Sequence, residues 1–330
     1  MREAACVNIP EAPGDASLCP ACDSAEFRTL FTATDRLYRT TTKTFQIVEC
    51  RHCRLLRLYP RPAPAEARQH YPDNYWFAPE PAAADRLEET YRRLVLSDHV
   101  GFVRRALRDS QESGPVLDVG CGGGLFLRLL KEEGSATLGL DASAQAAKLC
   151  WHGNGVPSVC GNLEEAPLPP QSCAVITMFH VLEHIESPQH YLLSARELLR
   201  PEGRLVVQVP NAACWQFLLL GENWSGIDVP RHLVNFRARD LELLLDSCGF
   251  EVLRRKYFSL RDNPAGFASS LAPWLDPMAR RVRNLRESPR RKLLKDLLYF
   301  ALVVAALPFT VVEAACQAGS TIMVEARKRS

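Results

Sequence analysis

A glycine-rich run from Asp118 to Gly124, with the sequence DVGCGGG, carries the residue types that point most directly to ligand binding. The apolar pair Val116 and Leu117 precedes it, and a leucine-rich helical pattern follows it. A strand, a glycine turn and a helix in this order build a pocket at the edge of a parallel sheet, because glycine lets the backbone turn tightly and approach a ligand. Leu125 stands where a dinucleotide fingerprint needs a small residue, and the run lacks the Gly-Lys-Ser/Thr ending of a P-loop. Both of those ligand classes are therefore disfavoured.

A carboxylate follows the next predicted strand. Residues 137–140, Thr-Leu-Gly-Leu, have the pattern of a short strand, and Asp141 stands at its end. Ligands bind at the carboxyl ends of the strands in this type of fold, and a carboxylate there can accept hydrogen bonds from both hydroxyls of a ribose. The sequence thus indicates a nucleoside-like ligand.

The spacing Asp-x-Gly-x-Gly-x-Gly of the run, followed by Asp141, resembles the class I S-adenosylmethionine (SAM)-dependent methyltransferases. This resemblance implies an α/β, Rossmann-like, seven-stranded sheet with SAM as its cofactor. Asn162 stands where the family usually carries an acidic residue, and its amide oxygen can accept only without charge assistance. The residues that the resemblance places at the cofactor are Asp118, Gly120, Cys121, Gly122, Gly124, Asp141, Asn162, Leu163 and Phe179.

The remaining predicted strands follow in the order of the family. Residues 174–178, 205–210 and 250–253 read as the fourth, fifth and sixth strands, and residues 321–326 read as the last. In this family the last strand pairs antiparallel with its neighbours. The resemblance covers about residues 113–258 and the C-terminal end, so we expect a methyltransferase domain over 113–330 with a helical hydrophobic insertion at 262–318.

Two CxxC pairs near the N-terminus predict a structural zinc site. Cys19 and Cys22 form the first pair, and Cys50 and Cys53 form the second. Two such knuckles bring four thiolates into a tetrahedron with no open position, which suits structural rather than catalytic Zn²⁺. The turn after a knuckle favours a positive φ and often carries glycine, but Asp23 and Arg54 stand there. A ribbon without metal, or with free core cysteines, is the alternative interpretation.

Residues 1–62 are thus predicted to form a zinc-ribbon-like domain, and residues 63–112 an aromatic lid segment with a linking helix over Asp85–Arg108. Tyr71, Tyr75, Trp76 and Phe77 supply the aromatic cluster. A ribbon, an aromatic cluster and a glycine loop in this order resemble a subgroup of methyltransferases that includes sugar C-methyltransferases. In that subgroup the aromatics cover the active site, whereas a plain packing cluster between domains is the alternative.

Two histidines are candidates for a general base. His180 follows the fourth predicted strand, and His232 lies in a Pro-Arg-His run after the fifth. Both loops belong at the ligand-binding edge of the sheet, and an imidazole titrates near neutral pH. Each histidine could equally be a structural group. We expect the nearby pair Glu183 and His184 to hold its loop by hydrogen bonds.

An apolar run from Leu297 to Val312 contains no charged residue, is interrupted by Pro308 and follows a cluster of arginines. It is shorter than the roughly 20 residues of a membrane span. If strands of one sheet lie on both sides of the run, a single crossing is excluded. A helical cap, a subunit interface or a helical hairpin dipping into one leaflet through residues 293–318 remains open.

Composition limits the remaining function classes. The chain has 330 residues, 47% of them hydrophobic, and a net charge of +2, so no strong field favours nucleic acid. Twelve cysteines without a visible signal peptide favour a reduced, cytoplasmic protein, peripheral to the inner face of a membrane if the run contacts lipid.

The leading prediction is O- or C-methylation of a small-molecule or lipid-like acceptor. One alternative is an RNA methyltransferase that uses Arg51, Arg54, Arg57 and Arg61 of the ribbon as a basic face. The other is a catalytically silent scaffold with a methyltransferase fold.

Overall fold

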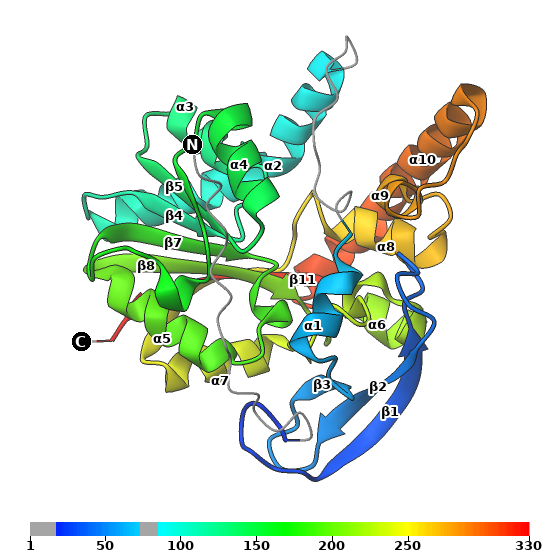
Figure 1. Ribbon diagram of the computed structural model, residues 1–330, viewed down its shortest axis with the longest axis horizontal. Helices are drawn as coiled ribbons and strands as arrows, with labels where there is room; N and C mark the ends of the chain where they lie inside the picture. Colours follow the sequence, from blue (N-terminus) through cyan, green and yellow to red (C-terminus); the bar gives the residue numbers. More distant parts are fainter. Residues whose placement is uncertain (1–17, 73–84, 330) are drawn as a thin grey trace.

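The computed structural model describes residues 18–72 and 85–329. It contains a seven-stranded sheet flanked by helices, a small four-stranded sheet beside it, and a long helix that projects from the body (Figure 1). Tyr75, Trp76 and Phe77 of the predicted aromatic lid lie outside the described residues.

The large sheet has the strand order β10-β11-β8-β7-β4-β5-β6. The pairs from β8 to β6 are parallel, and β11 is antiparallel to both β10 and β8. This arrangement confirms the predicted seven-stranded sheet with a reversed last strand. Its strands are β4 (Val116–Val119), β5 (Thr137–Asp141), β6 (Ser158–Cys160), β7 (Cys173–Phe179), β8 (Leu199–Pro210), β10 (Phe250–Lys256) and β11 (Thr321–Lys328).

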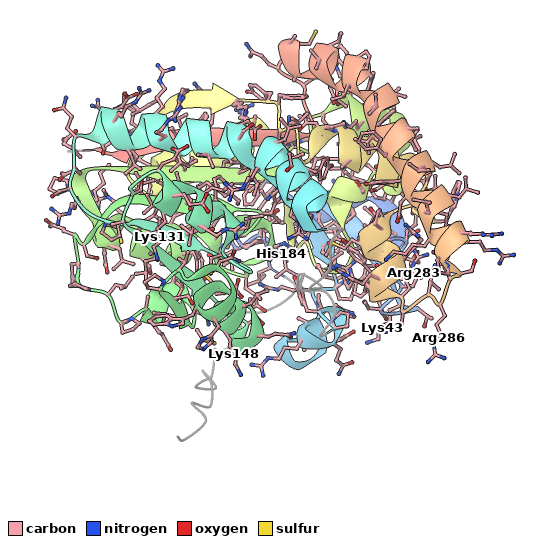
Figure 2. All side chains as sticks on the ribbon, turned by 90° about the horizontal axis from the view of Figure 1, so that it is seen from above. Lys43, Lys131, Lys148, His184, Arg283 and Arg286 are labelled. Atoms are coloured by element: carbon pink, nitrogen blue, oxygen red, sulfur yellow. The ribbon has the colours of Figure 1, made fainter. Side chains whose placement is uncertain are left out.

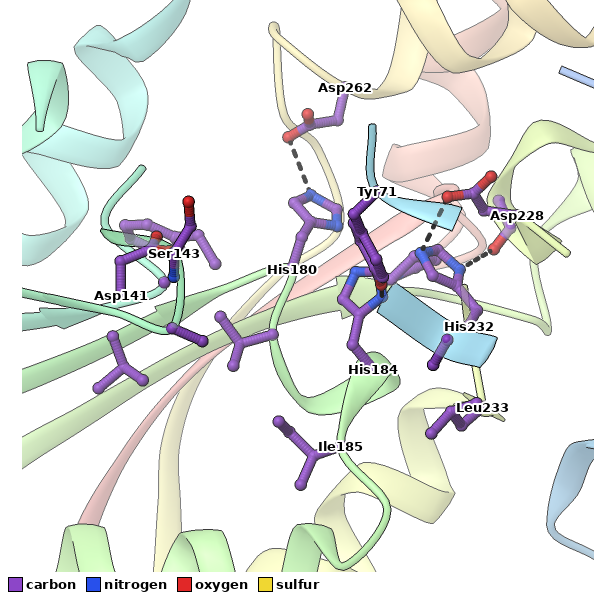
Figure 3. Close-up of a pocket in the computed structure, with 18 of the residues that line it drawn as sticks. Tyr71, Asp141, Ser143, His180, His184, Ile185, Asp228, His232, Leu233 and Asp262 are labelled. Carbon is purple, nitrogen blue, oxygen red and sulfur yellow. Dashed lines mark hydrogen bonds and ion pairs between the residues drawn. The ribbon is translucent and has the colours of Figure 1, made fainter. Parts of the chain in front are cut away.

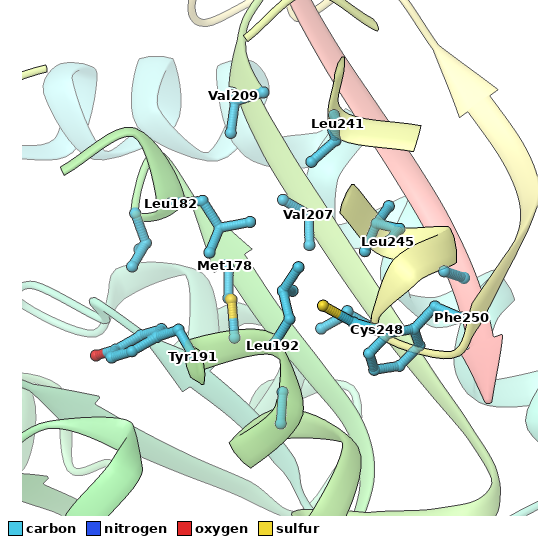
Figure 4. Packing of buried hydrophobic residues seen from close by; sticks show 14 of the residues in the cluster. Met178, Leu182, Tyr191, Leu192, Val207, Val209, Leu241, Leu245, Cys248 and Phe250 are labelled. Carbon is cyan, nitrogen blue, oxygen red and sulfur yellow. The ribbon is translucent and has the colours of Figure 1, made fainter. Parts of the chain in front are cut away.

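Helices cover both faces of this sheet because its strands alternate apolar side chains between the two faces. Leu117 and Ile176 pack in one apolar cluster, whereas their neighbours Val116 and Val175 pack in the other. Figure 4 shows the first cluster, where Leu192 and Leu245 approach Met178 and Val207 of the sheet. The first face carries α5 (Pro188–Leu198) and α7 (Ala238–Ser247), and the second carries α2 (Asp85–Ser110), α3 (Leu125–Glu132) and α4 (Ala144–Asn154).

The small sheet joins the N-terminal segment to the rest of the chain. Its order is β1-β2-β3-β9, and β9 comes from the loop after β8. Apolar residues of β2 and β3 share one buried cluster with Trp224 and Val229 of that same loop. The ribbon therefore packs as a continuous part of the fold. Its elements are β1 (Phe27–Thr34), β2 (Thr44–Cys50), β3 (Leu56–Tyr59), β9 (Val234–Asn235) and the adjoining short helix α1 (Pro64–Ala67).

The segment between β10 and β11 is helical, as predicted. It forms α8 (Asn263–Leu271), α9 (Pro277–Val282) and α10 (Pro289–Ala315), while the short helix α6 (Trp215–Leu220) lies against α10 through a contact between Trp215 and Phe309. Pro308 was expected to interrupt the apolar run, but α10 continues through it. A proline removes one backbone hydrogen bond, and the long helix on either side of Pro308 tolerates that loss.

Candidate cofactor and acceptor site

The glycine loop forms a tight cradle between β4 and α3. Gly120, Gly122 and Gly124 all have a positive φ, between +52° and +77°. A Cβ at Gly124 would lie 2.3 Å from Sγ of Cys150, and a Cβ at Gly120 would lie 2.7 Å from Cγ2 of Val181. Both the backbone conformation and the close approach therefore require glycine at these two positions.

Asp141 lies at the end of β5, beside this loop. Its Oδ2 accepts a hydrogen bond from the backbone N–H of Gly122 at 2.9 Å, and its Oδ1 accepts one from Ser143 at 2.8 Å. Burial raises the pKa of Asp141, and these two backbone donors partly oppose that shift. Each carboxylate oxygen keeps a second lone pair, so Asp141 can still accept from a ribose while it fixes the loop.

The predicted cofactor residues divide into two groups. Gly120, Asp141, Asn162 and Phe179 line a large cleft at the carboxyl edge of the sheet. Leu163, in contrast, is 2% exposed and packs in the core, while its N–H donates to the hydroxyl of Tyr191 at 3.3 Å. The structure gives the Leu163 side chain no place in the cleft, because the short helix that begins there turns it inward.

Asp118 and Cys121 also lie behind the cradle rather than in the cleft. The hydroxyl of Thr177 on β7 donates to Oδ1 of Asp118 at 2.6 Å. Burial raises the pKa of Asp118 to about 7. Asp118 is thus placed to anchor the loop from behind, and Cys121 packs there beside Gly139.

His180 lies between two carboxylates at the end of β7. Its Nδ1 is 3.1 Å from Oε1 of Glu183. Its Nε2 is 3.5 Å from Oδ2 of Asp262, and Figure 3 shows this second contact. Burial by itself lowers the pKa of His180, but the two carboxylates outweigh it and raise that pKa to about 9. A histidine that is already protonated at neutral pH accepts no further proton, so this arrangement does not favour His180 as a general base.

His232 lies on the other side of Glu183, in contact with His184. The two rings meet edge to face with centroids 4.7 Å apart. Nδ1 of His232 is 2.9 Å from the carbonyl oxygen of Gly226, to which it donates, and this leaves Nε2 as the proton acceptor. That Nε2 lies 3.9 Å from Oε1 of Glu183 and 4.0 Å from Oδ2 of Asp228. The geometry thus places Nε2 of His232 between the carboxylates of Glu183 and Asp228.

His184 is held neutral in the same cluster. Burial and the neighbouring His232 lower its pKa to about 4. Its Nδ1 lies 3.0 Å from the carbonyl oxygen of Arg231 and 2.9 Å from the hydroxyl of Tyr71. These bonds match the positioning role expected of His184. Together with Glu183 and His232 it also forms a group of three potential metal ligands within 4.8 Å of one another.

The cleft that these residues line has a volume of about 2160 Å³. The glycine cradle and Asp141 lie at one part of it, and His180, His184 and His232 lie at another (Figure 3). Asp262 was not identified from the sequence, although it follows β10 at the same carboxyl edge of the sheet. A carboxylate in the loop after a predicted parallel strand is the signal that could have found it.

The four predicted zinc ligands come together at the tip of the small sheet. Sγ of Cys19 lies 3.5 Å from Sγ of Cys53, and Sγ of Cys22 lies 3.6 Å from Sγ of Cys50. A tetrahedral Zn²⁺ with sulfur ligands at about 2.3 Å separates its ligands by about 3.8 Å. All four sulfurs lie within 4.8 Å of one another, so the donor set fits structural Zn²⁺.

A parallel sheet with one reversed last strand and a glycine cradle at its carboxyl edge defines the class I methyltransferase architecture. The chain matches a family described as "Methyltransferase domain" over residues 88–255, about half of its length, and it belongs to that family. The resemblance read from the glycine run is thereby confirmed.

Two relatives show how far the similarity extends. A probable SAM-dependent methyltransferase of Mycolicibacterium smegmatis is 32% identical over 184 residues, which cover 54% of this chain and 61% of that protein. A ubiquinone biosynthesis O-methyltransferase of Klebsiella pneumoniae is 32% identical over 171 residues, covering 49% of this chain and 71% of that protein. The match with the first relative therefore spans less than two thirds of its length.

A solved structure supports the fold alone. It is a putative sarcosine dimethylglycine methyltransferase from Galdieria sulphuraria, 15% identical, with a TM-score of 0.50. The similarity covers 80% of this chain and 98% of that one.

Proposed function

We propose that this protein transfers a methyl group from SAM to an oxygen or carbon of a small-molecule or lipid-like acceptor. The observation that carries the proposal is one cleft lined by Gly120 of the glycine cradle, by Asp141 at the end of β5 and by a cluster of histidines. Ligand sites usually measure about 300–1,000 Å³, so a cleft of about 2160 Å³ has room for a cofactor and an acceptor together.

In this proposal Gly120 and Asp141 bind and orient the cofactor, with Asn162 and Phe179 framing its base. SAM supplies an electrophilic methyl group, and in-line displacement requires the acceptor to be aligned behind it with water excluded. His232, through its Nε2, takes the proton from the acceptor. His180 stays protonated between Glu183 and Asp262 and positions the loop after β7.

Two observations favour an acceptor with apolar character. Met278 of α9 and Tyr299 of α10 line the cleft. The relatives that resemble this chain include enzymes named for O-methylation in ubiquinone biosynthesis. A sugar acceptor remains a prediction from the resemblance to sugar C-methyltransferases, because the aromatic cluster on which it depends lies mostly outside the described residues.

The ribbon does not favour the RNA alternative. Arg57 is 3% exposed and stacks on Phe27, Arg54 pairs with Glu49 at 3.1 Å, and Arg61 lies 3.6 Å from Glu186. Three of the four arginines on which an RNA-binding face was to depend are thus engaged within the protein.

Isothermal titration with S-adenosylhomocysteine tests the donor site. We expect Asp141→Ala to weaken binding at least tenfold. The change removes the carboxylate proposed to accept hydrogen bonds from the ribose, and it also removes the hydrogen bond that the Gly122 N–H donates to Asp141. Glu164→Gln, a change at the rim of the same cleft, is the matched control and should bind as the unaltered protein does. Absence of binding at about 1 mM ligand, or equal binding by Asp141→Ala, would contradict the proposal.

The base is tested by turnover once an acceptor is found. His232→Gln should keep the affinity for S-adenosylhomocysteine and lose about 10²- to 10⁴-fold in kcat, the usual contribution of general base catalysis. Binding of the cofactor product without turnover on any acceptor pool would instead favour the silent scaffold.

A further inference from the structure

Helix α10 presents a continuous apolar stripe to solvent. Its exposed side chains from residue 293 to residue 312 are all apolar, and eight of the large ones are between 47% and 61% exposed. Together with the exposed Ala301, Ala305 and Pro308, they recur every three or four residues along a helix of 27 residues, about 40 Å long. The eight are Leu293, Leu294, Leu297, Leu298, Phe300, Val304, Val311 and Val312.

The opposite side of α10 packs against the rest of the protein. Near its start, Arg280 of α9 pairs with Asp296 and with Glu287. In its last turns, the buried carboxylate of Glu313 accepts hydrogen bonds from the backbone and side-chain N–H groups of Gln216 at 2.9 Å. Asp296 and Glu313 thus attach α10 to the protein on the side opposite the apolar stripe.

By length and composition α10 could cross a membrane. The fold excludes a crossing, because both ends of the helix attach to one folded body. Arg283, shortly before α10, donates to the carbonyl oxygen of Arg36 beside the small sheet, and β11, shortly after it, pairs with β10 and β8. A helix whose two ends return to one side can only lie along a bilayer.

The charge at the start of α10 indicates which surface would cover the stripe. Arg286, Arg290, Arg291 and Lys292 are exposed there, directly before the apolar residues. Figure 2 shows Arg286 near this end of the helix, with the outer side chains of α10 pointing away from the body. Basic residues beside an apolar stripe complement anionic headgroups above acyl chains, whereas in a parallel pairing of two copies the same clusters would repel each other.

We infer that α10 lies in one leaflet of an anionic membrane, with its apolar stripe among the acyl chains and its basic N-terminal end among the headgroups. The cleft then opens beside the lipid, since Tyr299 of α10 lines it and contacts Ser269 of α8 at 2.9 Å between hydroxyl oxygens. Entry of a lipid-like acceptor by this route rests on the proposed function, whereas the membrane contact does not.

Flotation of the full chain with vesicles tests the contact. We expect the protein to float with vesicles of phosphatidylcholine containing phosphatidylglycerol, and at least tenfold less with phosphatidylcholine alone. Leu297→Glu/Val304→Glu/Val311→Glu places three charges on the stripe and should abolish flotation. Arg290→Gln/Arg291→Gln/Lys292→Gln should remove the preference for the anionic lipid.

Trp151→Glu/Leu243→Glu, which charges two equally exposed apolar side chains on α4 and α7, is the matched control and should float as before. Titration with S-adenosylhomocysteine shows whether each variant is folded, and it separates failure of the membrane contact from failure of the methyltransferase proposal. Flotation that is unaffected by the three glutamates would overturn the inference. So would a concentration-dependent dimer that those glutamates dissociate, with no flotation, because the stripe would then be a subunit interface.

Discussion

At the scale of single residues, the site depends on groups whose charge is set by their neighbours. His180 has a positive φ of 58°, which is uncommon for a residue other than glycine, and this conformation places its ring between Glu183 and Asp262. The protonated imidazole in turn keeps the pKa of Glu183 low, although burial alone would raise it. Histidines 180, 184 and 232 therefore have distinct environments within one cleft.

The raised pKa of His180 predicts that stability falls as the pH rises. An unfolded histidine loses its proton near pH 6.5, whereas folded His180 keeps it to about pH 9. Its contribution to the free energy of unfolding, about 3 kcal/mol at most, is therefore complete below pH 6.5 and lost between pH 6.5 and 9. Urea unfolding across this range should show a shallower decline for His180→Gln, while the exposed control His190→Gln should follow the unaltered protein. If the free energy of unfolding fell equally steeply with pH in His180→Gln and in the unaltered protein, His180 would not have the raised pKa.

Gly124 and Gly122 of the cradle allow a steric clash to be tested against a control, because both have a positive φ but only one lies close to another side chain. Gly124→Ala adds a Cβ 2.3 Å from Sγ of Cys150, whereas a Cβ at Gly122 meets no atom within 4 Å. Both substitutions place alanine at a positive φ, at a cost of roughly 1 kcal/mol. We expect thermal unfolding to show a loss of roughly 3 kcal/mol for Gly124→Ala because of the added overlap. Equal losses at the two positions would show that α4 can move away from the loop.

At the scale of elements, the turn after each cysteine knuckle has a backbone conformation that its residue adopts only at a cost in energy. Asp23 and Arg54 follow the knuckles with φ values of +55° and +70°, the conformation expected where glycine is common. Their N–H groups donate to the carbonyl oxygens of Cys19 and Cys50, which closes both turns. A non-glycine residue in this conformation costs roughly 1–2 kcal/mol. Metal binding across four thiolates would offset that cost.

Replacing one of the four cysteines should therefore lower both the zinc content and the thermal stability of the protein. We expect the purified protein to contain zinc by mass spectrometry, and Cys50→Ser to lose most of it and to lower Tm by more than about 5 °C. The exposed Cys316→Ser serves as the control. An unchanged zinc content in Cys50→Ser would mean that the knuckles do not hold the metal.

At the scale of the whole molecule, a buried ion pair joins the N-terminal segment to the loop that carries His232. Arg231 contacts Asp35 at 2.9 Å and Asp228 at 2.7 Å, and the side chains of Arg231 and Asp35 are fully buried. The guanidinium also lies 4.5 Å from the ring centroid of Tyr38. The ribbon thus fixes the loop that forms one wall of the cleft.

Breaking this pair should destabilise the fold as one unit. Arg231→Met leaves a buried, unpaired Asp35 and should cost about 3–5 kcal/mol in urea unfolding. Arg329→Met removes a solvent-exposed pair with Asp246 and should cost about 1 kcal/mol or less. A separate early transition of the ribbon, with the main transition unchanged, would show that the two sheets unfold independently.

Much of this architecture could be predicted from short patterns in the sequence. The strand before Gly120, the knuckles at Cys19 and Cys50 and the helix over residues 85–110 follow from periodicity and spacing that short-range physics dictates. The inward turn of Leu163 and the addition of β9 to the ribbon could not be read in this way, because both depend on which distant apolar surfaces meet.

The sequence by itself determined the order of elements, the glycine cradle, the four-cysteine cluster and the presence of an uncharged apolar run, because each depends on residues close together in the chain. Only the tertiary structure decided that His180 lies between carboxylates, that Nδ1 of His232 donates to a backbone carbonyl and that the apolar run faces solvent. Charge and exposure depend on neighbours from remote segments, such as Asp262 beside His180 and the helix α8 beneath α10.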